Sequence, residues 1–347
     1  MSLPDTARQD LVGPTHPTPT ETPRSGLRHH LRRGHQHVRG YLGALLALAV
    51  LVVVLVATEP TFLTTGNLKN VLVTNSSLFI VSVGMTFVLL SAGFDLSVGA
   101  IMAGAEEVLY LLLHAGVPAP LAIVVVLLGG FLLGAGLNGL LIGVAGLNFF
   151  VVTLGSMTLL YGVVDVVTNG ASQTISSSVL AHLGNGTVLG VPAPVVVLVV
   201  VIVLGGLVLR WTPYGRAVYA TGGNREAARL AGIRVPLVVM SVYGIAGLCA
   251  ALAGVVEAGR LASATPTAGS SIALISGAAV LLGGTSLFGG VGGLTGTVVG
   301  VLVIAVLGNA VNLLGVSNFW QDVVTGAVLL GAILLDRLQK RGQPSGH

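Results

Sequence analysis

Long apolar runs bounded by turn-forming residues recur along the chain. They fall at 41–58, 71–92, 97–114, 120–145, 149–168, 191–209, 237–256, 271–287, 294–314 and 320–336. A helix that rises 1.5 Å per residue needs about 20 residues to cross a hydrocarbon core about 30 Å thick, which is close to the length of these runs. The pattern therefore predicts an all-α integral membrane protein with about ten transmembrane helices.

Basic residues give the predicted helices an orientation. Residues 1–40, rich in Pro, Thr, Arg and His, are predicted to be a disordered basic tail, and 41–337 the polytopic transmembrane domain. With the N-terminal tail in the cytoplasm, ten crossings also place the loop 210–236 and the C-terminal tail 338–347 there. Only Lys69 and Arg260 of the 16 basic residues then lie outside. The positive-inside rule therefore predicts that both termini are cytoplasmic.

Composition agrees with a membrane protein. Hydrophobic residues make up 54% of the chain and charged residues only 8%, against roughly a quarter charged in soluble domains. The 50 glycines predict closely packed helices, because small residues let backbones approach each other. The single cysteine, Cys249, excludes an intramolecular disulfide and a thiolate metal cluster.

Two glycine-rich polar stretches interrupt the apolar pattern, at Gly93–Gly99 and Gly283–Gly293. Irregular backbone at membrane depth survives only where protein or a water-filled cavity satisfies its polar groups, so such breaks can mark a transport pathway. They can equally be tight cytoplasmic turns, in which Asp95 and Ser97 cap the next helix. The two interpretations are compatible.

Three motifs give the chain a resemblance to a known family. In the first, Gly84–Thr86 runs into Gly93–Ala100. In the second, Gly215–Asn224 is followed by Glu226–Ile233. The third is Leu282–Gly290 with Asn309, Asn312 and Leu313–Gly315 downstream. In this order they resemble the motifs of inner-membrane permeases of ribose-type ABC importers, a family that also handles xylose, galactose and autoinducer-2. The resemblance covers roughly residues 60–337.

The resemblance implies a function and a set of partners. A permease of this type translocates a monosaccharide or related small polar solute across the cytoplasmic membrane, works beside a second permease copy, receives its solute from an extracytoplasmic sugar-binding protein and is driven by a separate ABC ATPase. The loop 210–236 would dock on that ATPase through Gly215, Arg216, Asn224, Glu226, Ala227, Ala228, Arg229 and Gly232. Without the resemblance, the same loop is a solvated basic segment that only fixes topology. Within it, Glu226–Ala228 followed by Gly232 predicts a short helix that ends at glycine.

The chain also departs from the family pattern. Where the family usually carries a Glu-Leu-Asp-Ala-Ile segment, this chain has Ala273–Gly277 and lacks both carboxylates. Conversely, Glu106, Glu107 and Glu257 stand where apolar or small residues are expected. These differences leave the identity of the solute open.

Polar residues within the apolar runs are candidates for a substrate pathway. They could hydrogen-bond a sugar, or they could simply bridge neighbouring helices. The candidates are Asn75, Asp95, Ser97, Glu106, Asn138, Thr153, Asn309 and Asn312.

Enzymatic chemistry finds no support in the sequence. The chain's only lysines, Lys69 and Lys340, do not follow a phosphate-binding glycine loop, so ATP and Mg²⁺ would be used by the partner ATPase. No motif indicates a catalytic residue, a resident metal or cofactor, or a nucleic-acid partner. The basic tail could contact anionic membrane lipid.

Two other functions stay open at this point. An ion-coupled secondary transporter would use Glu106 or Asp95 to carry a proton or a sodium ion. A branched-chain amino-acid or nucleoside permease of the same superfamily would share the ATPase-docking loop. That loop distinguishes the first alternative, because a secondary transporter has no ATPase to dock.

Overall fold

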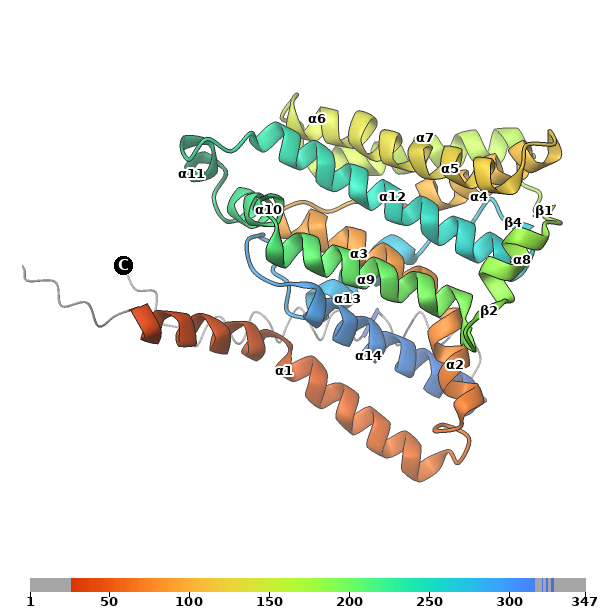
Figure 1. The fold of residues 1–347 in the computed structure, drawn as a ribbon, viewed down its shortest axis with the longest axis horizontal. Helices are drawn as coiled ribbons and strands as arrows, with labels where there is room; N and C mark the ends of the chain where they lie inside the picture. Colours follow the sequence, from red (N-terminus) through yellow and green to blue (C-terminus); the bar gives the residue numbers. More distant parts are fainter. Residues whose placement is uncertain (1–25, 316–319, 321–322, 324–325, 328–347) are drawn as a thin grey trace, which may run out of the picture. The chain divides into compact units, whose positions relative to one another are not determined.

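The computed structural model of the chain describes residues 26–315 together with Trp320, Val323, Gly326 and Ala327, with side chains described from residue 42 onward. These residues are mostly helical (Figure 1). The helices are α1 (Gly26–Thr58), α2 (Thr65–Thr74), α3 (Ser76–Leu90), α4 (Val98–His114), α5 (Ala119–Leu132), the π-helix η1 (Leu133–Gly139), α6 (Leu140–Gly143), α7 (Phe149–Thr168), α8 (Ser178–Asn185), α9 (Ala193–Trp211), α10 (Pro213–Gly223), α11 (Arg225–Leu230), α12 (Val235–Leu261), α13 (Ile272–Leu282) and α14 (Leu294–Leu313).

Five helical segments in the described part of the chain are long and apolar enough to cross a membrane. They are Ala119–Gly143, Phe149–Thr168, Ala193–Trp211, Val235–Leu261 and Leu294–Leu313. A sixth is possible if α2 and α3, which bend by 47° at Asn75, form one span. These segments confirm the prediction of a helical membrane protein. Most of the predicted run 320–336 lies outside the described residues.

The structure differs from the predicted helix boundaries in informative ways. Helix α1 begins at Gly26, inside the segment predicted as a tail. Helix α13 has 11 residues, about 16 Å of helix, because Gly283 and Gly284 end it before the predicted boundary at 287. In the loop 210–236 there are two helices, α10 and α11, where only a short helix from Glu226 was predicted.

Four two-residue strands were also not predicted. Strand β1 (Gln173–Thr174) pairs antiparallel with β4 (Ser263–Ala264), and β2 (Thr187–Val188) pairs with β3 (Val191–Pro192). They lie at one end of the helices together with α8, whereas α10 and α11 lie at the other end (Figure 1). Two-residue pairs leave no alternating pattern in the sequence, so periodicity could not reveal them.

Helix α12 is the centre of the packing. It contacts α3, α4, α5, η1 and α8, and every residue of α3 is buried. Glycines make these contacts close. A Cβ atom added to Gly130 of α5 would lie 2.6 Å from the carbonyl oxygen of Gly247, and one added to Gly134 of η1 would lie 2.1 Å from that of Tyr243. The high glycine content therefore reflects helix packing around α12.

Adjacent glycines in α5 allow this packing to be tested. Gly130→Ala should lower the thermal unfolding temperature in detergent, because the new methyl group collides with the α12 backbone, and overpacking of this kind costs about 1–3 kcal/mol. Gly129→Ala is the matched control, since nothing lies within 4 Å of its added Cβ and alanine favours a helix over glycine. Equal unfolding temperatures for the two variants would contradict this account of the glycines.

Candidate functional site

A buried polar cluster joins the turn after α3 to η1 and α7. The Asp95 carboxylate accepts hydrogen bonds at Oδ1 from the Ser97 backbone N–H (2.8 Å) and the Ser97 hydroxyl (2.6 Å). Asn138 of η1 donates to Ser97 Oγ (2.7 Å), and Ser156 of α7 donates to Asn138 Oδ1 (2.6 Å). All four side chains are buried. We call Asp95, Ser97, Asn138 and Ser156 the Asp95 cluster.

The π-helical turn positions Asn138 in this cluster. Seven residues of η1 widen the helix between α5 and α6, a feature often found at functional positions. Gly134 and Gly139 of η1 lie against the α12 backbone, where added Cβ atoms would come within 2.1 Å of the Tyr243 oxygen and 2.6 Å of Met240 Cα. The glycine face therefore turns towards α12, and Asn138 reaches the turn between α3 and α4.

Two oxygen atoms in this region keep hydrogen-bonding capacity. Asp95 Oδ2 and Thr153 Oγ1 are buried and have no hydrogen-bond partner among the described residues. Thr153 lies one helical turn from Ser156 on α7, so the two share a face. The predicted candidates Asp95, Ser97, Asn138 and Thr153 thus come from three separate segments to one region. This arrangement can hold three helical segments together and still accept further donors at these two oxygen atoms.

The capping role proposed for the first glycine-rich stretch is seen in modified form. Asp95 accepts from the N–H of Ser97, the residue immediately before α4, while Ser97 itself makes no side-chain cap hydrogen bond. Both glycine-rich stretches are connections between consecutive helices, α3 to α4 and α13 to α14.

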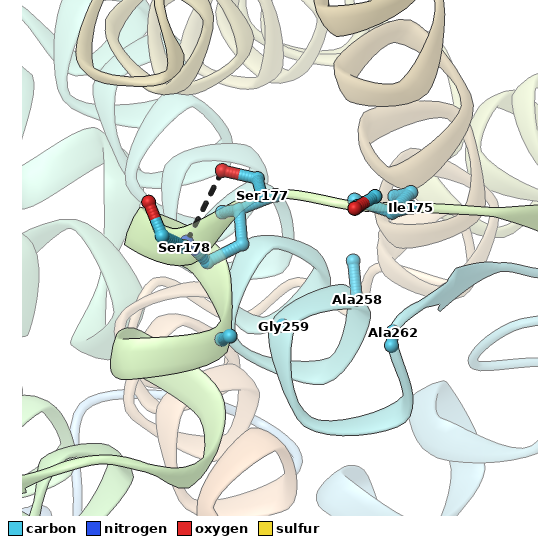
Figure 2. Close-up of a pocket in the computed structure, with 9 residues that line it drawn as sticks. Ile175, Ser177, Ser178, Ala258, Gly259 and Ala262 are labelled. Atoms are coloured by element: carbon cyan, nitrogen blue, oxygen red, sulfur yellow. Dashed lines mark hydrogen bonds between the residues drawn. The ribbon is translucent and has the colours of Figure 1, made fainter.

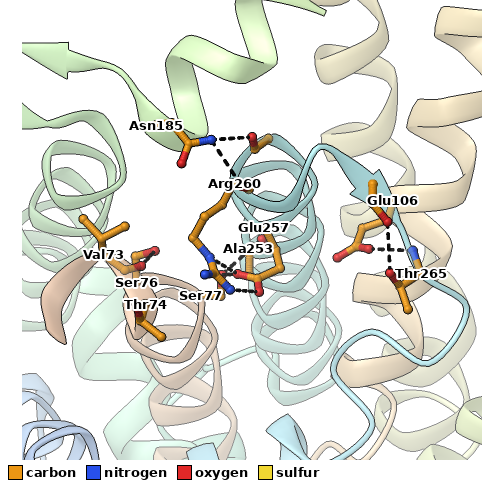
Figure 3. Close-up of polar contacts among 12 residues, drawn as sticks. Val73, Thr74, Ser76, Ser77, Glu106, Asn185, Ala253, Glu257, Arg260 and Thr265 are labelled. Atoms are coloured by element: carbon orange, nitrogen blue, oxygen red, sulfur yellow. Dashed lines mark hydrogen bonds and ion pairs between the residues drawn. The ribbon is translucent and has the colours of Figure 1, made fainter. Parts of the chain in front are cut away.

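Glu106 lies at a different place, in the middle of α4. Its Oε2 accepts a hydrogen bond from the Thr265 backbone N–H (3.1 Å) in the segment after β4, as Figure 3 shows. Within the described residues its Oε1 atom, like Oε1 of Glu107, has no partner. Glu106 therefore ties the segment after β4 to α4 and does not join the Asp95 cluster.

A second charged group was missed as a site by the sequence analysis. Glu257 and Arg260, three residues apart on α12, form an ion pair whose side chains are 16% and 22% exposed. Ser77, at the start of α3, donates to Glu257 Oε2 (2.9 Å), and Asn185 of α8 donates to the carbonyl oxygens of Gly259 and Arg260 (Figure 3). The i, i+3 spacing of opposite charges was the signal for the pair.

The remaining pathway candidates do not converge with these clusters. Asn75 lies at the bend between α2 and α3 and donates to the Val71 carbonyl oxygen (2.8 Å). Asn309 of α14 exchanges two hydrogen bonds with Asn67 of α2 (2.9 and 3.0 Å), a helix-bridging role. Asn312 is exposed. The eight candidates are therefore distributed over several places in the described structure.

A cavity of about 260 Å³ lies beside α8 (Figure 2). Its lining combines the segment before α8, including Ile175 and Ser177, with the end of α12 at Ala258 and Ala262. None of the predicted pathway residues lines it. Ser177 caps α8 by accepting from the Leu180 N–H (3.5 Å).

The loop 210–236 folds into two capped helices. The Thr212 hydroxyl accepts from the Gly215 N–H, and the Asn224 side chain accepts from the Ala227 N–H, so each helix begins with a side-chain cap. After α11, Gly232 has φ of +81°, with hydrogen bonds from Gly232 N to Arg229 O and from Ile233 N to Ala228 O. This is the glycine-terminated helix end predicted from the sequence.

The predicted docking residues include exposed side chains, which a partner can contact, and buried residues, which hold the loop in place. Arg216, Asn224, Glu226, Ala227 and Arg229 are exposed, whereas Gly215 and Ala228 are buried. The Glu226 and Arg229 side chains are 72% and 74% exposed, and their ion pair spans 3.8 Å. An exposed pair of this kind contributes little to stability, so both charges can be used by a partner.

The fold and these sites define a class of protein, a multi-pass helical membrane protein with polar clusters inside its helix bundle. The family described as branched-chain amino acid transport system / permease component matches residues 67–333, and the chain belongs to this family. It is therefore a transport subunit of the cell membrane. No solved structure matches the chain.

Individual relatives are similar over most of the chain. The ribose import permease protein of Bacillus subtilis is 44% identical over 300 residues, which cover 85% of this chain and 92% of that protein. The D-allose transport system permease protein of Escherichia coli is 38% identical, with 85% and 91% covered. A probable ABC transporter permease protein of Sinorhizobium fredii is 36% identical, with 86% and 89% covered.

The Asp95 cluster can be tested for its effect on stability. Ser156→Ala should lower the unfolding temperature in detergent, because the buried Asn138 oxygen loses its donor, at a cost of about 1–3 kcal/mol. Thr158→Ala on the same helix is the control, since Thr158 is exposed and, among the described residues, bonds only to Leu154 of its own helix. The cluster would have no bridging role if both variants unfolded at the wild-type temperature.

Proposed function

We propose that this chain is the membrane-spanning permease subunit of an ABC importer for a monosaccharide or a related small polar solute. The observation that carries the proposal is the similarity to ribose and D-allose permeases over more than four-fifths of both chains. The relative from Sinorhizobium fredii, named as a probable ABC transporter permease, supports ATP as the source of energy.

The proposal includes a set of partners. An extracytoplasmic binding protein delivers the solute, a second permease copy completes the pore, and a separate ATPase uses ATP and Mg²⁺. The exposed charges of Arg216, Glu226 and Arg229 on α10 and α11 support this end of the protein as the place where the ATPase docks. The turn at Gly232 supports the same assignment, because its φ of +81° fixes the direction in which α11 ends.

The Asp95 cluster and Thr153 are the proposed polar part of the pathway. They lie inside the helix bundle, come from three segments and retain unused acceptor atoms, so a sugar hydroxyl could bond there in one state of the transport cycle. Asn75, at the bend between α2 and α3, is the proposed hinge of the same pathway. Glu106, Asn309 and Asn312 are further proposed pathway residues, as polar side chains within the apolar runs.

The proposed topology has ten spans with both termini in the cytoplasm. The excess of basic residues in the loop 210–236 supports this topology. The position of α10 and α11 at the opposite end from β1, β4 and α8 supports it as well (Figure 1). In this topology the chain crosses the membrane an odd number of times between these two ends. The loop containing α10 and α11 then faces the cytoplasm, where the ATPase lies.

Single cysteines can test this sidedness. In a Cys249→Ser background, Leu189→Cys should react with a membrane-impermeant thiol reagent in intact cells, and Arg225→Cys should react only after permeabilisation. Leu189 is fully exposed at 100%, Arg225 is exposed and Cys249 is buried, so accessibility within the folded chain does not limit the two sites. Labelling of both cysteines in intact cells would exclude the proposed topology.

Uptake into proteoliposomes tests the function. The chain, reconstituted with its cognate ATPase and binding protein, should accumulate radiolabelled ribose only when ATP is present, and unlabelled allose should compete more strongly than leucine. Uptake driven by an ion gradient without the ATPase would favour the secondary-transporter alternative. Strong competition by leucine without any by sugars would favour the branched-chain amino-acid alternative.

A further inference from the structure

Three segments that are far apart in the sequence meet at one point. They are the end of α3 at Leu90, the end of α10 at Gly222, and the connection between α13 and α14 at Gly290. The Gly290 N–H donates to the Leu90 carbonyl oxygen (2.9 Å). A Cβ atom added to Gly222 would lie 1.8 Å from that oxygen and 2.8 Å from the Gly290 nitrogen. We call this meeting point the glycine joint.

Backbone lies directly against backbone in the joint. An added Cβ on Gly289 would be 2.7 Å from the Ala92 nitrogen and 2.8 Å from the Gly222 oxygen. Gly289 and Gly290 also have φ values of +83° and +71°, which residues with side chains rarely adopt. The second glycine-rich stretch therefore follows this path because it has to fit between α10 and the end of α3.

A tyrosine side chain fixes the same helix to the same connection. The Tyr219 hydroxyl of α10 donates to the Gly292 carbonyl oxygen (3.0 Å). Tyr214, earlier on α10, makes a different contact, a hydrogen bond with Ser241 of α12 (2.7 Å). Helix α10 thus has one tyrosine bonded to the α13–α14 connection and another bonded to the central helix.

The geometry has a mechanical consequence. The end of α3 leads directly into the turn that carries Asp95, and the connection at Gly290 joins α13 to α14. Close-packed interiors have little free volume, so a displacement of α10 has to move both connections or break the joint. The same displacement reaches the Asp95 cluster, because Leu90 lies only five residues before Asp95.

We propose that α10 is a relay that moves the α3–α4 turn and the α13–α14 connection together, with Gly222 and Tyr219 as its positioning residues. The exposed face of α11 receives the movement of the ATPase, and α10 transfers it to both connections through the glycine joint. This inference rests on the proposed function and adds to it the element that links docking to the helices around the pathway.

Two variant pairs separate a relay from ordinary packing. Tyr219→Phe removes the bond to Gly292 and is compared with Tyr214→Phe, which removes a tyrosine hydroxyl from the same helix without affecting the joint. Gly222→Ala places a methyl group in the joint and is compared with Gly223→Ala, whose added Cβ has nothing within 4 Å. Each variant is reconstituted with the cognate ATPase and binding protein, and co-purification, ATP hydrolysis and radiolabelled ribose uptake are measured.

If α10 is a relay, variants of the glycine joint should impair transport without impairing docking of the ATPase. Tyr219→Phe should co-purify with the ATPase like the wild type but take up about fivefold less ribose per ATP hydrolysed, as expected for loss of one hydrogen bond from the coupling. Gly222→Ala should show a larger loss, and both controls should match the wild type. A docking variant, Arg229→Glu, should instead reduce co-purification itself, because it reverses an exposed charge on α11.

Three results would overturn the inference. Wild-type ratios of uptake to ATP hydrolysis in both Tyr219→Phe and Gly222→Ala would show that the joint is packing only. Loss of co-purification in Tyr219→Phe would show that the bond to Gly292 is needed for docking itself, and would remove the role of α10 as a relay. A wild-type chain that neither binds the ATPase nor takes up ribose would overturn the proposed function, and the relay with it.

Discussion

Direct contact between helix backbones is the constraint on which the rest of this structure depends. In lipid, a helix satisfies its own backbone hydrogen bonds, and association comes mainly from close packing. Here α12 supplies the surface, and glycines of its neighbours lie against it: Gly130 against Gly247, Gly134 against Tyr243, and Gly184 of α8 against Gly259. Because these contacts leave no room for a methyl group, they fix the depth and rotation of each neighbour around α12.

That packing determines where polar groups can be buried. The π-turn η1 places its glycines against α12 and so directs Asn138 towards Ser97 and Ser156. At the opposite end, Gly259 brings α8 close enough for Asn185 to bond the last carbonyl oxygens of α12, beside the Glu257–Arg260 pair. The buried hydrogen bonds of Asn138 and the more exposed ones of Asn185 therefore both depend on glycine contacts that themselves carry no polar side chain.

The two glycine-rich stretches serve packing and connection at once. Each is a turn between consecutive helices, yet the first contains Asp95 and Ser97 of the Asp95 cluster and the second meets α10. An importer has to couple events on its cytoplasmic face to helices inside the membrane, and such coupling needs an element with contacts to both. In the described residues, α10 has these contacts through Gly222 and Tyr219.

The sequence by itself determined the class of protein and the glycine end of α11, whereas the tertiary structure decided which polar residues act together. Apolar runs of about 20 residues, the scarcity of charge and the three motifs were enough to predict a helical membrane permease, and the family match and the helices confirm it. A cap depends on neighbours in the chain, so the end of α11 at Gly232 was predictable. The bend at Asn75 was not, since the four polar residues Thr74–Ser77 are too few to interrupt the predicted apolar run 71–92. Nothing in the spacing of the pathway candidates separates Asn138 from Asn309, because the packing of helices distant in the chain brought the first to Ser97 and the second to Asn67. The same holds for Gly222, whose neighbours in space are distant in the chain, so only the folded protein could show why that position has no room for a side chain.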